Sequence, residues 1–352
     1  MILRRVSWFK MPNVLATCLW FKGLLGWRLK TSRISLRSWR GGVRGGMATK
    51  MLPIAWHLRP LRRMSTRTYQ RWAPEFWDEY AVIDSGDGAR LERFGDLILD
   101  RPDPAAVWSR RLGTDAWDEA HARFEPTGRT KGNWVPLDTV PEGWNINYRS
   151  PRLQLRFHLE MTRFKHVGIF PEQAANWEYI AEHLQAGDKF LNLFAYTGGA
   201  SIAARSVGAE VTHVDAIRQV VDWTRINMEL SGLDGIRWVV EDALKFAQRE
   251  QRRGNTYKGI VLDPPTWGLG PKGQKWRLED NLLNLCAAVA DLLEPGGFII
   301  MNTYSGIAPS ALETVWQRIL PSAEFEVGEL CLRGQDGHWI PTGSLIRITS
   351  QP

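Results

Sequence analysis

The sequence predicts an α/β fold with a mostly parallel sheet that closes in a C-terminal antiparallel hairpin, preceded by a small β-rich N-terminal domain. Three observations predict it. Apolar runs alternate with helical patterns through the second half of the chain, a glycine turn follows the first of these runs, and two strand-like runs, 326–332 and 344–349, end it. Alternating strands and helices are typical of parallel sheets, because parallel neighbours need a long crossover connection.

The first strand, turn and helix carry the most informative pattern. Residues 190–194 predict a buried strand, residues 195–201 a turn with two adjacent glycines that opens a helix, and residues 210–215 a second strand that ends in Asp215. Glycine lets a backbone approach a ligand closely, and a helix start offers unpaired N–H groups. Asp215 lies where an acid accepts hydrogen bonds from both hydroxyls of a ribose. The sequence therefore predicts a nucleotide-binding βαβ unit.

The ligand of this unit is better matched by a cation than by a dinucleotide. The adjacent glycines depart from the G-x-G-x-x-G spacing that holds a pyrophosphate. Two more predicted strands, 236–240 and 259–262, lead into Asp242 and Asp263. Because the strand ends of an open parallel sheet face the ligand crevice, these two acids and Asp215 should line one cleft. Three carboxylates without a phosphate motif favour a cationic nucleoside such as S-adenosylmethionine.

The remaining elements complete the alternating order. Helical patterns separate the strands at residues 201–207, 217–231, 244–252 and 278–293. Residues 298–302 predict the last parallel strand, and Glu294–Gly297 is expected to end the helix before it, since glycine favours positive φ there. Residues 267–277, rich in glycine and lysine, predict a mobile loop over the acceptor. The antiparallel hairpin predicted from the runs 326–332 and 344–349 is absent from most nicotinamide-dependent dehydrogenases. After the glycine spacing, it is a second reason to disfavour a nicotinamide cofactor.

Charge divides the chain into a leader and a folded part. Residues 1–74 contain sixteen Lys or Arg and no Asp or Glu, whereas residues 75–352 hold 29 basic and 38 acidic residues. The folded part is therefore acidic and gives no support for a broad phosphate-binding surface. An Arg-rich, Ser-containing, acid-free leader is typical of a mitochondrial transit peptide, so we expect the protein in the mitochondrial matrix. Met47, Met51 and Met64 leave open a shorter start.

No membrane span is predicted. The apolar patches within residues 13–27 are interrupted by Lys22 and fall short of the roughly 20 apolar residues that a span requires. The three cysteines have no paired or metal-like spacing, so no metal site is predicted.

Residues 75–160 predict the small β-rich domain, and residues 161–352 the larger α/β domain. The first of these ranges holds short apolar pieces separated by turn signals. Its tryptophans either stack on bases or belong to the core, and the core is favoured. They are Trp108, Trp117, Trp134 and Trp144.

Several motifs together resemble a known family. They are Ile83–Gly88, Phe170–Trp177, Leu191–Ala200, Asp263–Pro265, Gly270–Gly273 and Asn302–Ser305. From about Tyr80 to Pro352 the chain resembles the class I S-adenosylmethionine-dependent methyltransferases related to the bacterial large-subunit ribosomal RNA cytosine methyltransferases. The resemblance implies a Rossmann-like methyltransferase fold, with Asp215 on the cofactor's ribose and Asp242 at its adenine. It also implies that residues 170–177 close over the methionine end.

The cofactor-binding residues that this resemblance implies lie at the predicted strand ends and in that closing segment. They are Phe170, Gln173, Asn176, Ala195, Tyr196, Thr197, Gly198, Asp215, Ala216, Asp242, Ala243 and Asp263. For Gln173 and Asn176 the alternative is a helix face exposed to water. Lys165 and His166 are further candidates for the cofactor carboxylate or the acceptor, or have a structural role.

One departure from the family changes the predicted chemistry. Its carbon-5 pyrimidine branch attacks the base with a cysteine at a strand end, but here Thr303–Ser305 and Thr266 occupy the corresponding positions. A structural role is favoured for Cys286 and Cys331, because free cysteine is among the most buried residue types. We therefore predict direct transfer to a heteroatom without a covalent enzyme intermediate.

Direct transfer needs groups that hold the acceptor's hydrogens and align it with the methyl group. Asp263, Pro264 and Tyr304 are the catalytic candidates. In amino-group methyltransferases an aromatic residue follows this proline motif directly and stacks on the base, whereas here Trp267 is displaced by one position. The other interpretation is that Asp263 caps the next helix.

By resemblance, ribosomal RNA is the first-choice acceptor and RNA a candidate partner, although the chain has no room for the whole RNA-binding PUA module of the related enzymes. Local basic clusters such as Lys272, Lys275 and Arg277 bind RNA or form a solvated face. The alternatives are a methyltransferase that acts on a protein or small molecule, and a non-catalytic ribosome assembly factor with the same fold.

Overall fold

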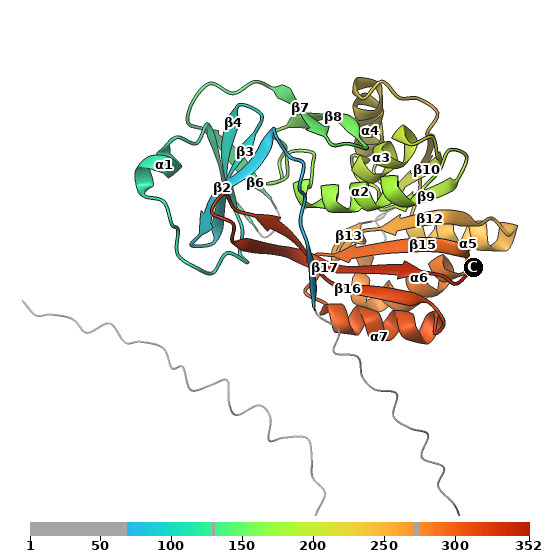
Figure 1. Cartoon of the computed structure of the whole chain (residues 1–352). Coiled ribbons are helices and arrows are strands. Elements are labelled where there is room, and N and C mark those ends of the chain that lie inside the picture. The colour runs from blue at the N-terminus through green and yellow to red at the C-terminus, as the bar shows by residue number, and fades with distance from the viewer. Residues whose placement is uncertain (1–68, 129–130, 270–274) are drawn as a thin grey trace, which may run out of the picture. The chain divides into compact units, whose positions relative to one another are not determined.

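An eight-stranded sheet forms the centre of the computed structural model, which describes residues 69–128, 131–269 and 275–352 (Figure 1). Neighbouring strands follow the order β1 (Gln70–Trp72), β16 (Glu324–Arg333), β17 (Trp339–Thr349), β15 (Leu293–Thr303), β12 (Tyr257–Leu262), β9 (Lys189–Leu193), β10 (Glu210–Asp215) and β11 (Arg237–Val240). Strand β17 is antiparallel to both of its neighbours, and all other pairings in this sheet are parallel. The predicted sheet and its closing hairpin are confirmed.

The direction in which strands are added reverses beside β9. The chain proceeds outward from β9 through β10 to β11 and then returns to β12 on the other side of β9. The register aligns the last residues of β9, β10, β12 and β15 along one edge of the sheet. Ligands of open α/β sheets bind at such a reversal, outside the carboxyl ends of the strands.

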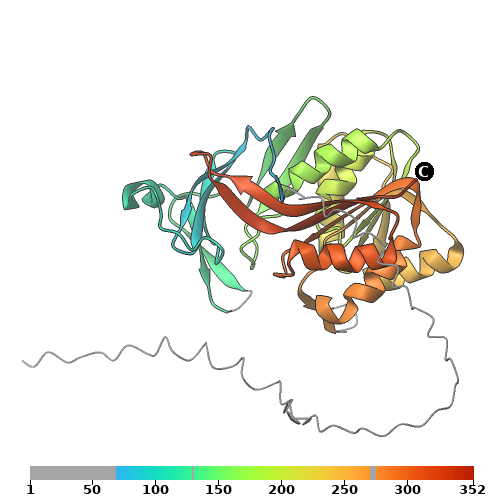
Figure 2. The same cartoon turned by 60° about the horizontal axis from the view of Figure 1, so that its bottom comes forward.

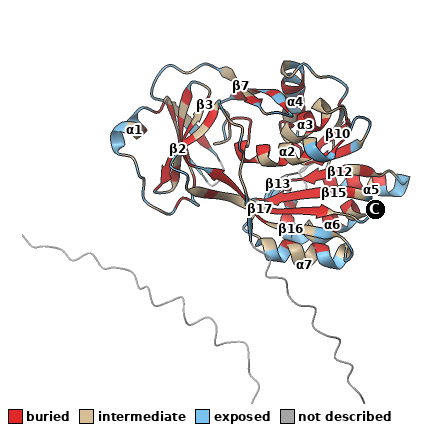
Figure 3. Ribbon diagram, viewed as in Figure 1, coloured by how far each residue is buried: buried red, intermediate tan, exposed pale blue. Residues whose placement is uncertain are grey.

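Helices cover both faces of the sheet (Figure 1). One face carries α2 (Ala174–His183), α3 (Gly199–Ser206) and α4 (Arg218–Leu230), and the other carries α5 (Ala243–Arg253), α6 (Leu278–Ala290) and α7 (Pro309–Ile319). The alternation of side chains along β9 explains the two layers. Phe190 packs in the cluster of the first group, whereas Leu191 and Leu193 pack in the cluster of the second. The central strands β12 and β15 are buried along most of their length (Figure 3).

A β-rich part precedes the parallel sheet. It contains a five-stranded sheet, a short helix and a separate two-stranded pair: β2 (Tyr80–Gly86), β3 (Ala89–Phe94), β4 (Leu97–Pro102), α1 (Thr114–Asp118), β5 (Ala122–Pro126), β6 (Gly132–Pro136), β7 (Gly143–Arg149) and β8 (Gln154–Glu160). One hydrophobic cluster joins both β units to α2 and α3. It includes Phe94 of β3, Tyr148 of β7, Trp177 of α2 and Ile202 of α3, so the β-rich part shares a core with the helices.

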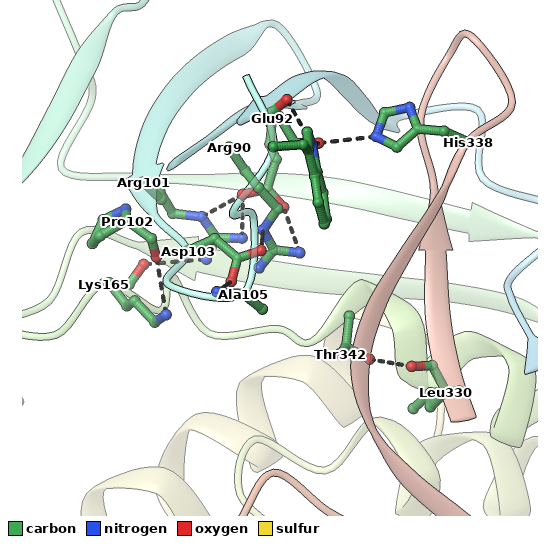
Figure 4. Close-up of polar contacts among 12 residues, drawn as sticks. Arg90, Glu92, Arg101, Pro102, Asp103, Ala105, Lys165, Leu330, His338 and Thr342 are labelled. Carbon is green, nitrogen blue, oxygen red and sulfur yellow. Dashed lines mark hydrogen bonds and ion pairs between the residues drawn. The ribbon is translucent and has the colours of Figure 1, made fainter. Parts of the chain in front are cut away.

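The hairpin of β16 and β17 extends from the parallel sheet to the five-stranded sheet (Figure 2). Gly334 forms a β-bridge with Val82, and His338 Nε2 lies 2.9 Å from Ser85 Oγ. Figure 4 shows His338 at this contact and the Thr342 hydroxyl donating to the Leu330 carbonyl farther along the hairpin. The end of the chain therefore ties the β-rich part to the larger sheet.

Two predicted boundaries were wrong. Helix α6 ends at Ala290, and Glu294–Gly297 forms an irregularity in the pairing of β15 with β12, where Gly296 has the expected positive φ of 66°. In the predicted loop 267–277, β13 (Trp267–Leu269) pairs with β14 (Lys275–Arg277), and residues 270–274 lie outside the described residues. The backbone hydrogen bonds of this short hairpin replace the expected irregular loop.

The basic leader falls almost wholly outside the described residues, and so does Cys18. Within the described ranges, none of the helices has the length and apolar content needed to cross a membrane.

Candidate active site

The turn after β9 has a strained backbone that neighbouring elements hold in place. Phe194 and Tyr196 adopt positive φ angles of 56° and 49°, a conformation uncommon for residues other than glycine. Asn227 of α4 donates to the Thr197 carbonyl, and the Thr197 hydroxyl donates to the Gly168 carbonyl at 2.6 Å. Such strain persists where the surroundings enforce it and is common at functional sites.

The two glycines of this turn have a packing reason that the sequence did not reveal. Gly198 has a φ of 83°, and a Cβ there would collide with the side chain of Thr224. A Cβ on Gly199 would lie 2.5 Å from the Trp177 ring. We expected these glycines to admit a ligand. In the structure, α4 fills the space beside Gly198 and α2 fills the space beside Gly199.

Asp215 ends β10 beside this turn. Its Oδ2 accepts from the backbone N–H of Tyr196 at 2.9 Å, and its Oδ1 accepts from the N–H of Ile217 at 2.9 Å. Burial raises the pKa of Asp215, and these backbone N–H groups oppose the shift. An ionised carboxylate has about four lone-pair positions, so two stay available for a pair of hydroxyls. Ala216 follows half-buried, and Ile217 is 51% exposed.

Ile217 is an exposed apolar residue beside Asp215 that the sequence analysis did not single out. An apolar side chain two positions after the acid at a strand end is the signal that would have identified it.

Asp242 follows β11 and has a structural role as well. Its Oδ1 accepts from the backbone N–H of Lys245 at 2.9 Å, which makes it the N-cap of α5. Ala243 is buried as the first residue of that helix. Capping was considered for Asp263, but the helix after Asp263 begins at Leu278 with Arg277 at its N-cap position, so that interpretation was wrong.

The segment from Phe170 to Asn176 lies against the strand ends. A one-turn 3-10 helix, η1 (Pro171–Gln173), leads into α2. Gln173 Nε2 donates to Asp263 Oδ2 at 3.3 Å and to Tyr304 Oη at 3.2 Å. Asn176 is 1% exposed and donates to Gln173 Oε1 at 2.8 Å. The alternative of a water-exposed helix face is therefore wrong for Asn176, whereas Gln173 is half-buried.

Phe170 is the centre of an aromatic group at the mouth of the site. Its ring centroid lies 4.6 Å from that of His166, 5.4 Å from that of Tyr196 and 5.6 Å from that of Tyr304. Burial raises the pKa of Tyr196 to about 12 and, with the nearby Arg101, holds the pKa of His166 well below its usual range. His166 is therefore neutral, and this wall is apolar.

Lys165 contacts a cluster of charged residues of the β-rich part (Figure 4). Its Nζ donates to the Pro102 carbonyl at 3.0 Å, and Arg101 Nη1 donates to the Lys165 carbonyl at 3.1 Å. Arg101 Nη2 pairs with Glu92 at 2.7 Å, and Arg90 Nε pairs with Asp103 at 3.2 Å. The side chain of Lys165 thus ties the β-rich part to the site rather than extending into it.

Asp263 follows β12 at the middle of the strand-end row. Burial raises its pKa to about 8, a hydrogen bond from Asn302 opposes the shift, and the nearby Glu172 carboxyl adds to it. A carboxyl with a pKa in this range can take a proton near neutral pH. Pro264 after it is buried, and the next carbonyl, that of Pro265, accepts from Trp276 Nε1 at 2.7 Å. Trp267 is 56% exposed.

Tyr304 follows β15, and its ring is 37% exposed. Its hydroxyl donates to Glu172 Oε1 at 2.9 Å. Burial, the Glu172 charge and the Asp263 charge all raise the pKa of Tyr304. Its partner Glu172 is 4% exposed, and the sequence analysis did not identify it as a site residue. An acid between a proline and a glutamine at a helix start gives no distinctive signal.

Neither described cysteine belongs to this site. Cys286 is buried in α6 within the cluster on the α5–α7 face, and Cys331 is buried in β16. Burial raises the pKa of each thiol to about 12. A buried thiol that ionises so reluctantly is a poor nucleophile. Among the described residues, no cluster of His, Cys, Asp and Glu is arranged to hold a metal ion.

Comparisons with known proteins agree with this geometry. Residues 102–329 match the family model described as S-adenosylmethionine-dependent methyltransferase. The crystal structure of the SAM-dependent methyltransferase from Agrobacterium tumefaciens shares 33% sequence identity at a TM-score of 0.74, over 81% of this chain and 95% of that chain. The chain therefore belongs to the S-adenosylmethionine-dependent methyltransferase family, whose cofactor is S-adenosylmethionine.

More distant similarities extend to other methyltransferases. Ribosomal RNA large subunit methyltransferase I of Aeromonas hydrophila is 31% identical over 172 residues, which cover 46% of this chain and 40% of that protein. Ribosomal RNA large subunit methyltransferase K of Neisseria meningitidis is 24% identical over 226 residues, 58% of this chain and 59% of that protein. SMU.776, solved in complex with SAH, shares the fold at a TM-score of 0.61 and 18% identity. The chain spans less than two thirds of either curated relative's length.

Proposed function

We propose that this protein transfers a methyl group from S-adenosylmethionine directly to a heteroatom of RNA, with ribosomal RNA as the first-choice acceptor. The observation that carries the proposal is Asp263, a half-buried carboxyl that follows a central strand, has a pKa raised to about 8 and shares the Gln173 amide with Tyr304. The names of the Aeromonas and Neisseria relatives support an RNA acceptor.

The residues present fit the cofactor. Asp215 would hold the two ribose hydroxyls, Ile217 would contact the adenine face, and Asp242 would lie near the adenine edge. Phe170, Gln173 and the turn from Ala195 to Gly198 would surround the methionine part. When bound, the cofactor supplies an electrophilic methyl group on a positively charged sulfur.

The acceptor side of the site needs little chemistry from the protein. Asp263 and Tyr304 orient the acceptor, and the ionised form of Asp263 takes the proton that the acceptor loses. The exposed Trp267 ring, separated from the proline motif by Thr266, is suited to stack on a base. Because neither described cysteine belongs to the site, the proposed route has no covalent adduct on sulfur.

Residues 1–74 would serve as the mitochondrial address of this enzyme. Their excess of Arg and Lys without acids supports this part of the proposal.

A methyl-transfer assay tests the proposal. The full chain, tritium-labelled cofactor and ribosomal RNA from cells that lack the gene are combined, and the labelled RNA is counted. We expect label in RNA from deletion cells and little in RNA from wild-type cells, which is already modified. Asp215→Ala should abolish both cofactor binding and transfer. If a protein with intact cofactor binding leaves both RNA samples unlabelled, the proposed RNA substrate is wrong.

A further inference from the structure

The polar groups around Tyr304 fix the direction of its hydrogen bonds. The Tyr304 hydroxyl has one proton, and it donates that proton to Glu172 Oε1 at 2.9 Å. Gln173 Nε2 donates to the same phenol oxygen at 3.2 Å. A phenol oxygen has two acceptor positions, so one remains. Toward the site, Tyr304 can therefore only accept a hydrogen bond.

A chain of donors fixes Gln173 in this orientation. Arg347 on β17 is 7% exposed, and its guanidinium can only donate. Its Nη2 donates to Asn176 Oδ1 at 3.1 Å, and Asn176 Nδ2 donates to Gln173 Oε1 at 2.8 Å. The Gln173 NH₂ group must then face the site, where it donates to both Asp263 and Tyr304. Each amide in the chain has one permitted orientation.

Glu172 is placed to accept the Tyr304 proton, since its Oε1 lies 2.9 Å from the phenol oxygen. Burial raises the pKa of Glu172, and the positive charge of Arg90 and the Tyr304 hydrogen bond oppose this shift. In its ionised form the carboxylate cannot donate to Tyr304, and the proton on the phenol is then directed away from the acceptor.

Asp263 completes the pattern with its remaining lone pairs. Once ionised, its carboxylate can only accept, like the free position on Tyr304. A single atom that satisfies both groups must carry two hydrogens. A hydroxyl has one hydrogen, a ring nitrogen or carbonyl none, and an amino group two.

We propose that Glu172 and the Arg347–Asn176–Gln173 chain are positioning residues that make the site select an amino group as methyl acceptor. This rests on the proposed methyl transfer but not on RNA as the carrier. As the amino nitrogen forms its bond to the methyl carbon, the broken carbon–sulfur bond leaves its electron pair on sulfur. One N–H proton passes to Asp263, and Tyr304 accepts a hydrogen bond from the other.

The first experiment uses the native protein. The full chain and labelled cofactor are incubated with the RNA and protein fractions of cells that lack the gene, and the methylated product is hydrolysed and identified by mass spectrometry. A methyl group on an exocyclic base amine supports both proposals, and one on a protein amine supports amino selection while refuting the RNA substrate. A methyl group on a hydroxyl, ring atom or carbon overturns amino selection while the methyltransferase assignment stands. No transfer to either fraction overturns both.

A double-mutant cycle separates positioning from general stability. Tyr304→Phe and Glu172→Leu should each lower kcat about tenfold, the loss expected for one hydrogen bond to a reacting group. Glu172→Leu should cost nothing further when Tyr304→Phe is already present. SAH binding should be unchanged in all three variants. Glu182→Leu, which removes a carboxylate from the solvent-exposed side of α2, is the matched control and should keep full activity. Additive losses in the double variant would show that Glu172 does not act through Tyr304.

Discussion

At the residue scale, the proposed chemistry depends on a carboxyl kept out of water. Asp263 has a pKa raised to about 8 because burial disfavours its charge, and the hydrogen bond from Asn302 offsets only part of this cost. The same burial makes Asp263 a suitable proton acceptor and a source of instability. Active sites commonly combine these two properties.

The instability should depend on pH with a defined sign. Asp263 has an ordinary pKa of 3.8 and a folded pKa of about 8. Between these values the folded protein binds more protons than the unfolded chain, so this residue lowers stability as the pH rises. Asp263→Asn removes the titration and should raise Tm relative to the wild type more at pH 8.5 than at pH 5.5.

Thermal unfolding at the two pH values measures this difference. Asp234→Asn is the control, because the Asp234 side chain is 92% exposed and its replacement should not change the pH dependence. An equal Tm difference at both pH values for Asp263→Asn would contradict a raised pKa.

The cysteines give a second residue-scale prediction. Cys286 is fully buried in α6, so Cys286→Ala should cost roughly 1 kcal/mol of stability through lost packing and leave the methyl-transfer rate unchanged. Incubation of the wild type with a 5-fluoropyrimidine RNA and cofactor, followed by mass spectrometry, should show no protein–RNA adduct. An adduct on either described cysteine would refute direct transfer.

At the element scale, the turn between β9 and α3 is fitted to its neighbours. Gly198→Ala combines a strained positive φ with a collision against Thr224, so we expect a loss of about 2–3 kcal/mol in the free energy of unfolding. Gly232→Ala has a φ of 69° without any atom near the added Cβ and should cost about 1 kcal/mol. Denaturant unfolding measures the loss in the free energy of unfolding for each variant. The difference between the two losses is the cost of the collision with Thr224.

A compensating change sharpens this comparison. The atom that would collide is Thr224 Cγ2, and Thr224→Ser removes it while keeping the hydroxyl that donates to the Tyr196 carbonyl. Stability should be partly restored in Gly198→Ala/Thr224→Ser. No recovery would mean that the backbone conformation alone requires glycine.

The elements of the parallel sheet could be predicted from the sequence, because strand runs such as 259–262 and 298–301 are continuous and apolar on both faces. The hairpin at Trp267 could not, since two three-residue strands rich in glycine and lysine carry no periodicity. Asp215 and Asp263 were identifiable because each ends a strand. Glu172 and Ile217 were not, because their roles arise from contacts between segments far apart in the chain.

At the scale of the whole molecule, the site is assembled from both halves of the sheet. Gln173 lies before β9, Asp263 follows β12, and Arg347 lies on β17, so the hydrogen-bond chain joins distant parts of the sequence. Through this chain, Arg347 on β17 determines which side of the Gln173 amide faces the acceptor pocket.

The charge division of the chain gives a prediction about its location. Residues 1–74 fused to a fluorescent protein should direct it to mitochondria, since the segment is basic and acid-free. A matched fusion with the sixteen Lys and Arg replaced by Gln should stay in the cytosol. Identical distributions of the two fusions would contradict a targeting role.

Calorimetric titration of the full chain with S-adenosylmethionine and with SAH, each in two buffers of different ionisation enthalpy at pH 7, most directly tests the central claim that a methyl donor binds beside Asp263. A positive sulfur near the Asp263 carboxyl lowers the pKa of that carboxyl. Binding of S-adenosylmethionine should therefore release more protons than binding of SAH (S-adenosylhomocysteine), whose sulfur is neutral. The difference should vanish in Asp263→Asn. Equal proton release by the two ligands, or no binding of either, would contradict the account.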